Sequence, residues 1–209
     1  MKQSARTWTV VALVCVIGVA ASPADAQPFD SPEAVFAEAQ TAFNQRDWAG
    51  FVGLVSPARR DELIGQMAVT FAFMAQQPGA DPRVGAMVDA YLPRDVDPMD
   101  LMMTSDDPAA ETIRLAKRIG RPQAFFAEAM EVAFALEHPD PDRAPRITEM
   151  NKVALDEEAQ TAIGTITLEA PAPPAEAADA ESPDADGLVT REDTWSFARH
   201  EGSWYLTMR

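Results

Sequence analysis

The spacing of apolar residues changes once along this chain, and that change constrains the fold more than any other feature. From residue 31 to residue 138, apolar side chains such as Val35, Phe36 and Ala39 recur at the period of an amphipathic helix. From Ile147 onward they alternate with polar ones, which is the period of a half-buried strand. Helices that precede strands, rather than alternating with them, indicate the α+β class with an antiparallel sheet.

Cap and breaker residues divide residues 31–77 into three predicted helices, which we expect to form the core layer. Ser31-Pro32-Glu33 is a typical helix start, with a side-chain cap, a proline at the first helical position and an acid in the first turn. Asp47 predicts the cap of a second, short helix. Pro57 predicts the start of a third helix, which ends before Pro78-Gly79.

Residues 80–138 predict further helices in shorter pieces. The apolar stripe that contains Val84 and Met87 ends at Pro93, a basic helix ends at Gly120, and His138-Pro139 ends the last helix. We therefore expect a helical insertion in the middle of the chain.

The remaining chain predicts two hairpins and a loop. Residues 146–168 predict two strands joined around Asp156-Glu157-Glu158. Residues 169–187 contain only proline, alanine and acids besides one serine and one glycine, which predicts a disordered acidic loop. Residues 188–209 predict the closing hairpin.

The register of the closing hairpin follows from its turn. If Glu201-Gly202 is the turn, Arg199 lies opposite Trp204, Phe197 opposite Leu206, and Trp195 opposite Met208. Side chains alternate along a strand, so these six share one face. That face should pack on the helices.

The first 26 residues indicate an exported protein. Lys2 and Arg6 precede an apolar run that ends near Ala21, and Ala24-Asp25-Ala26 is a typical cleavage site before Gln27. Residues 1–26 are thus predicted to be a signal peptide, residues 27–209 a single domain, and the location periplasmic or secreted. The one cysteine, Cys15, lies inside the apolar run and lacks a small residue before it, so it does not favour lipidation.

Charge excludes two classes of partner. The chain has 17 basic and 33 acidic residues. Removal of residues 1–26 takes away Lys2, Arg6 and Asp25, leaving 15 basic and 32 acidic side chains. A chain this acidic repels nucleic acid and anionic membrane, so we expect neither as a partner after signal cleavage.

Two segments resemble the nuclear transport factor 2-like superfamily, the cystatin-like α+β cone that includes SnoaL-like proteins. The first is SPEAVFAEAQTAFNQRDWAGFVGLVSP at residues 31–57. The second spans residues 147–209 and includes VALDEEAQTAIGTITL at residues 153–168 and WSFARHEGSWYLTMR at residues 195–209. The match is partial, because residues 80–138 are longer and more helical than the family pattern.

The resemblance implies a curved antiparallel sheet wrapped against helices, with an apolar cavity between them. The candidates to line a ligand pocket there share an apolar side chain on an element expected to face that cavity: Phe36, Phe71, Trp195, Phe197, Trp204 and Leu206. Family members include isomerases, dehydratases, ligand binders and interaction domains, so the fold does not choose among them.

Several polar groups are candidates for catalytic or metal sites, and each is better explained by a structural role. Asp95, Asp97 and Asp100 could pair for acid–base chemistry, but Asp100 fits the first turn of a helix. No glycine-rich phosphate loop or ordered Ser/His/Asp set is present, so we expect no cofactor, metal or catalytic residue. The other polar candidates lie in loops and turns or, for Asp193, in the first strand of the closing hairpin: His138, Asp140, Asp142, Ser182, Asp184, Asp186, Asp193 and His200.

Three functions remain open from the sequence. The first is an exported, non-catalytic domain that binds an apolar small ligand or a protein partner. The second is a small-molecule isomerase or dehydratase with a cavity carboxylate and Tyr91 or Tyr205 as a hydroxyl donor. The third is a structural or assembly role with the cavity filled by side chains.

Overall fold

The computed structural model describes residues 29–95, 97, 107–138, 140, 144–171 and 188–207. The helices are α1 (Pro32–Gln45), α2 (Trp48–Gly53), α3 (Pro57–Ala75), α4 (Pro82–Tyr91), α6 (Pro108–Arg118) and α7 (Pro122–Glu137). The strands are β1 (Arg146–Asp156), β2 (Thr161–Pro171), β3 (Leu188–His200) and β4 (Ser203–Leu206). The described helices thus precede a four-stranded antiparallel sheet, which confirms the α+β class.

The predicted helix starts are confirmed. The Ser31 hydroxyl accepts a hydrogen bond from the backbone N–H of Ala34 at 3.2 Å, and the Asp47 carboxylate accepts one from Gly50 at 2.9 Å. Each bond satisfies a backbone donor that the first helical turn leaves without a partner. α3 begins at Pro57. Signals within a few residues therefore determine where α1, α2 and α3 begin.

The sheet is a meander in the order β1-β2-β3-β4. Arg199 pairs with Trp204 and Phe197 with Leu206, so the register predicted for the closing hairpin is confirmed. The turn residues Glu201 and Gly202 both have positive φ, at 51° and 87°. The predicted pairing of Trp195 with Met208 lies outside the described residues.

The acidic loop was predicted to start at residue 169, which is too early in the chain. β2 continues to Pro171, and residues 169–171 pair with Thr190, Val189 and Leu188 of β3. Composition alone places these residues in a loop, but the facing strand supplies backbone hydrogen-bond partners that override that local preference. Residues 172–187, the remainder of the predicted loop, lie outside the described residues.

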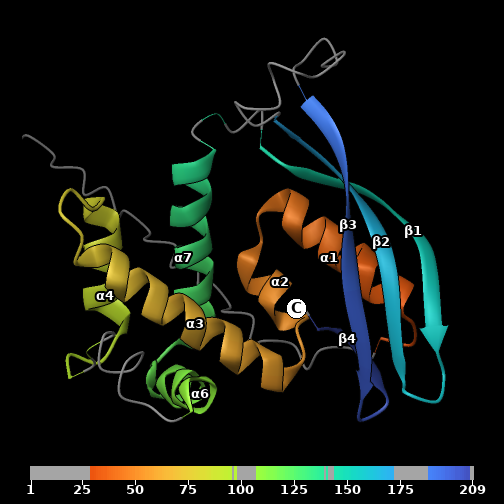
Figure 1. Cartoon of the computed structure of the whole chain (residues 1–209), viewed down its shortest axis with the longest axis horizontal. Helices are drawn as coiled ribbons and strands as arrows, with labels where there is room; N and C mark the ends of the chain where they lie inside the picture. The colour runs from red at the N-terminus through yellow and green to blue at the C-terminus, as the bar shows by residue number, and fades with distance from the viewer. Residues whose placement is uncertain are drawn as a thin grey trace, which may run out of the picture.

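α1 crosses one face of the curved sheet obliquely, and we call this the inner face (Figure 1). Near the start of α1, the carbonyl of Phe29 accepts a hydrogen bond from Trp204 of β4 at 3.0 Å. Near its end, the amide of Asn44 contacts the backbone of Ile147 in β1 through bonds of 2.8 and 2.9 Å. The helix therefore runs from the start of β4 to the start of β1.

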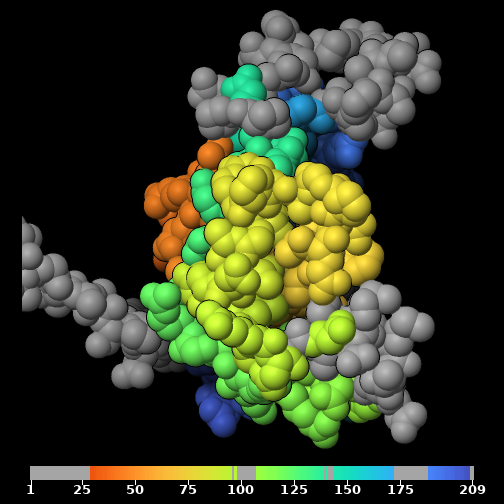
Figure 2. Space-filling view, turned by 90° about the vertical axis from the view of Figure 1, so that its left-hand side faces the viewer, coloured from red at the N-terminus to blue at the C-terminus, as the bar shows by residue number. Residues whose placement is uncertain are grey.

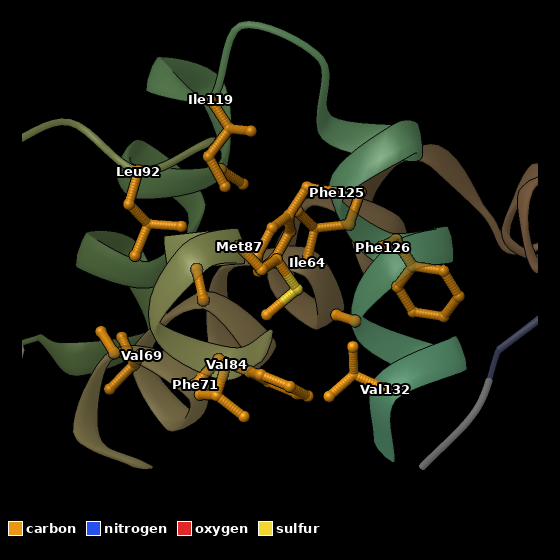
Figure 3. Packing of buried hydrophobic residues seen from close by; sticks show 14 of the residues in the cluster. Ile64, Val69, Phe71, Val84, Met87, Leu92, Ile119, Phe125, Phe126 and Val132 are labelled. Atoms are coloured by element: carbon orange, nitrogen blue, oxygen red, sulfur yellow. The ribbon is translucent and has the colours of Figure 1, made fainter. Parts of the chain in front are cut away.

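The buried apolar side chains of the described residues form two hydrophobic cores. The sheet-side core joins α1 and α2 to the sheet and includes Val35, Phe51, Ile166 and Phe197. The helical core joins α2 to α3, α4, α6 and α7. In Figure 3, Met87 of α4 and Ile64 of α3 point toward the same space beside Phe125 of α7. α2 contributes to both cores and connects the two halves of the molecule.

The structure groups the helices differently from the predicted core helices (residues 31–77) and helical insertion (residues 80–138). α3 shares the helical core with α4, α6 and α7, whereas α1 packs on the sheet. Figure 2 looks onto the end of the molecule away from the sheet, where α3 and α4 form the yellow and yellow-green surface above α6.

Among the described helices, none has the length and apolar composition to cross a membrane.

Candidate functional site

Five of the six predicted pocket residues lie together. Phe36, Phe197, Trp204 and Leu206 belong to the sheet-side core, and the half-buried Trp195 packs against it. Phe71 is the exception: it is buried in the helical core, so its predicted place in the same pocket is wrong. The helical period of α3 predicts a buried face but does not show which element covers that face.

The side chains predicted to line a cavity fill the space between α1, α2 and the sheet. The ring of Trp195 lies 5.9 Å from that of Phe36 and 6.0 Å from that of Phe51, both in edge-to-face arrangements. This geometry is favoured for packed aromatic rings. Phe197 and Leu206 are each only 1% exposed. These residues act as core packing and present little surface to a ligand.

An open cleft lies beside this core, at one corner of the inner face. Its volume is about 530 Å³. We call it the corner cleft, and three parts of the chain line it: residues 30–33 at the start of α1; Val153, Leu155, Glu157 and Gln160 of the β1–β2 hairpin; and Arg199 and Trp204 of the β3–β4 hairpin.

The oblique path of α1 explains the cleft. Leu155 pairs with Ala162, which is buried, so its side chain points to the inner face. Because α1 leads from β4 toward the other end of β1, it does not cover this end of the strand. Leu155 is consequently 51% exposed, although its position in the alternating pattern is that of a core residue.

The rim of the corner cleft is polar. Asp30 and Glu33 lie on the α1 side and Glu157 on the hairpin side, and all three are exposed. Arg199 is the cation of the rim. Its Nε donates to the carbonyl of Gly202 at 3.2 Å, and its Nη1 lies 3.5 Å from the amide oxygen of Gln160. Trp204 forms the buried floor, at 5% exposure.

A second groove lies at the helical end of the molecule. It has a volume of about 450 Å³ and is lined by Met74, Val84, Leu136 and residues 77–81 between α3 and α4. Its one charged side chain, Asp81, is held by Arg83 through bonds of 2.8 to 3.0 Å. The hydrogen bonds from the side chain and backbone of Arg83 lower the pKa of Asp81 to about 2.

The aspartates weighed for acid–base chemistry do not form a free pair. Asp95 accepts two hydrogen bonds from the guanidinium of Arg118, at 2.6 and 2.7 Å. These bonds lower the pKa of Asp95 and link the end of α6 to the segment after α4. Asp97 also has a partner, and Asp100 lies outside the described residues.

Tyr91 is paired with a carboxylate, but on the surface. It donates a hydrogen bond to Glu128 of α7, and the guanidinium of Arg121 lies 5.2 Å from the centre of its ring. Glu128 is exposed, and no polar or charged residue among those described is buried. The described part of the chain therefore holds no buried carboxylate beside a tyrosine hydroxyl.

The hydrogen bond to Glu128 raises the pKa of Tyr91, and burial adds to the effect. The bond stabilises the fold below the usual tyrosine range, and that contribution is lost as the pH rises through the folded-state pKa. We expect Glu128→Gln to lower the titration midpoint of Tyr91. The chain has two tyrosines, so ultraviolet titration in a Tyr205→Phe background reports Tyr91 alone. Glu137→Gln, on the same helix, is the control; an equal shift in both variants would contradict the pairing.

His138 lies at the end of a helix and His200 beside a turn. His138 follows α7 and packs its ring 4.9 Å from that of Phe134. His200 is exposed next to the β3–β4 turn, 3.9 Å from the carboxylate of Glu201. Within the described ranges, no three His, Cys, Asp or Glu side chains gather as metal ligands.

The spacing of Ser182, Asp184, Asp186 and Asp193 resembles part of a calcium-binding loop, but the structure does not show a site there. Asp193 lies within β3, opposite Ile166, and is exposed. The other members of that pattern, Ser182, Asp184 and Asp186, lie outside the described residues, as does Asp142 of the pattern around His138.

The residues of the corner cleft were missed in the sequence, apart from Trp204. Asp30, Leu155, Glu157 and Arg199 come from three separate segments, and no motif links them. A comparison with protein-family models, with curated proteins and with solved structures gives no match.

Proposed function

We propose that this protein is an exported, non-catalytic domain that binds a protein partner through the corner cleft. The observation that carries the proposal is Leu155: it points to the inner face of the sheet, yet half of its surface is exposed beside the floor of Trp204. An apolar centre inside a polar rim is the usual anatomy of a protein interface.

The balance of polar and apolar groups favours a protein partner over an apolar small ligand. Small-molecule sites are mostly apolar and bury most of the ligand. The corner cleft instead is open and carries four charged side chains on its rim. The interior expected to hold an apolar ligand is occupied by Phe36, Phe51 and Trp195.

Export is the second part of the proposal. It is supported by the basic start, apolar run and cleavage pattern of residues 1–26. The resemblance to the nuclear transport factor 2-like superfamily also remains a proposal. Its support is the helix-cap pattern of residues 31–57 together with the closing hairpin.

Photo-crosslinking tests the proposed surface. Ile163 is a matched control for Leu155, because it is 47% exposed and lies in the adjoining strand but on the outer face of the sheet. We expect a photoreactive amino acid at position 155 to yield a heavier product with another protein in the exporting cells, and the same group at position 163 to yield none. Equal products at both positions, no product, or products with only this chain would overturn the proposal.

A further inference from the structure

We infer that the partner presents an extended segment to the corner cleft, with a leucine-sized apolar side chain next to a lysine or arginine. This inference rests on the proposed function, because it assigns the chemistry of the partner at that same cleft. It follows from the apolar wall, the charge of the rim, the hydrogen bonding at the start of α1, and the shape of β1.

The apolar wall requires an apolar side chain. Val153 and Leu155 of β1 line the cleft together with the buried Trp204. An aliphatic side chain of the partner would cover the exposed half of Leu155 and remove apolar surface from water, which is favourable in proportion to the area buried.

The rim favours a cation. Asp30, Glu33 and Glu157 form no ion pair with any described residue, and their side chains are exposed. The guanidinium of Arg199 is directed to two neutral oxygens, those of Gly202 and Gln160. Three carboxylates against one guanidinium leave the cleft with an excess of negative charge, which complements lysine or arginine.

The start of α1 does not offer a site for an anion. A helix N-terminus binds anions through backbone N–H groups that have no other partner. Pro32 has no N–H, and those of Ala34 and Val35 already donate to Ser31, at 3.2 and 3.3 Å. Only the N–H of Glu33 remains in this turn, next to its own carboxylate. An anionic segment is therefore disfavoured.

The shape of β1 disfavours a partner that adds a strand to the sheet. β1 is an edge strand, but its register with β2 shifts between Asn151 and Ala154, and Lys152 has a positive φ of 51°. A bulge and an edge lysine both hinder pairing with another strand. At the start of β1, Gln40 and Asn44 already occupy the carbonyl of Ile147. The partner segment therefore inserts side chains instead of pairing its backbone with β1.

Three capped synthetic peptides test this chemistry: Gly-Ser-Lys-Leu-Lys-Ser-Gly, the same peptide with Glu in place of both Lys, and the same peptide with Ser in place of Leu. Affinity is measured by calorimetry, and the site is mapped by chemical shifts of isotope-labelled protein. We expect the Lys-Leu-Lys peptide to bind about tenfold more tightly than either other peptide and to shift residues 30–33, 153–157 and 199–204. Its affinity should fall as salt is added.

Variants of the protein separate the contribution of charge to peptide binding from that of apolar contact. The double variant Glu33→Gln and Glu157→Gln should weaken the Lys-Leu-Lys peptide about tenfold, as expected for two exposed charge contacts. Leu155→Ser should weaken it to a similar extent, and Ile163→Ser should leave it unchanged.

A failure of the inferred partner chemistry can be distinguished from a failure of the proposed function. Equal binding of the Lys and Glu peptides, an unchanged affinity in the double glutamine variant, shifts confined to the groove around Leu136, or no binding of any peptide would overturn the inferred chemistry. The photo-crosslinking contrast between positions 155 and 163 does not depend on these peptides. It would still support or overturn the proposed function by itself.

Discussion

Trp204→Ala is expected to lower the free energy of unfolding by about 3–5 kcal/mol, the usual cost of truncating a buried aromatic residue. The indole is 5% exposed and packs in the sheet-side core, and the backbone N–H of the same residue bonds to Phe29. Alanine would leave a cavity between β4 and the start of α1. The two hairpins and α1 meet at this point, so neighbouring side chains cannot easily collapse into it.

Urea denaturation followed by circular dichroism measures this loss. Arg199→Ala is the matched control, because Arg199 pairs with Trp204 across the same hairpin but is exposed. Its replacement is expected to change stability by less than about 1 kcal/mol. A loss below about 1 kcal/mol for Trp204→Ala would contradict its role in the core.

Gly65→Ala is expected to lower the free energy of unfolding by about 2–4 kcal/mol, although alanine favours a helix more than glycine does. A Cβ atom at position 65 of α3 would lie 1.9 Å from the carbonyl oxygen of Thr112 in α6 and 2.5 Å from its carbon. The obstacle is backbone, so α3 and α6 would have to move apart. Such overpacking typically costs about 1–3 kcal/mol and sometimes more.

Gly85→Ala is the matched control for Gly65→Ala. Gly85 also lies inside a helix, α4, but a Cβ there would meet no atom within 4 Å. This substitution is expected to stabilise the protein by about 0.5–1 kcal/mol, because it removes the entropic cost of a helical glycine. The two changes should thus have opposite signs in thermal or urea denaturation. Equal effects would show that α3 and α6 do not approach closely at Gly65.

The starts of the first three helices and the last turn were predictable because their causes are local. The caps at Ser31 and Asp47 bond to amides three residues away, and the turn at Glu201-Gly202 determines which residues of β3 and β4 face each other. The end of β2 was not predictable in this way. Residues 169–171 are strand because β3 lies beside them.

The place of Phe71 and the corner cleft depend on how helices are directed in space. A period of 3.6 residues shows that one face of α3 is buried, but it does not show whether the sheet or another helix covers that face. α3 packs on α4, α6 and α7 and takes Phe71 with it. In the same way, the alternation of β1 predicts an inward Leu155, but only the path of α1 leaves it exposed.

Periodicity, caps and turns act over a few residues, so they predict the α+β class, the starts of α1, α2 and α3, and the register of the closing hairpin without any knowledge of the tertiary structure. Only packing in three dimensions brings Phe36, Phe51 and Trp195 into contact, and only packing gathers the residues that line the open cleft: Asp30, Leu155, Glu157 and Arg199. Their meeting depends on the crossing of α1 over the sheet, which results from packing between segments more than 100 residues apart, such as Asn44 and Ile147.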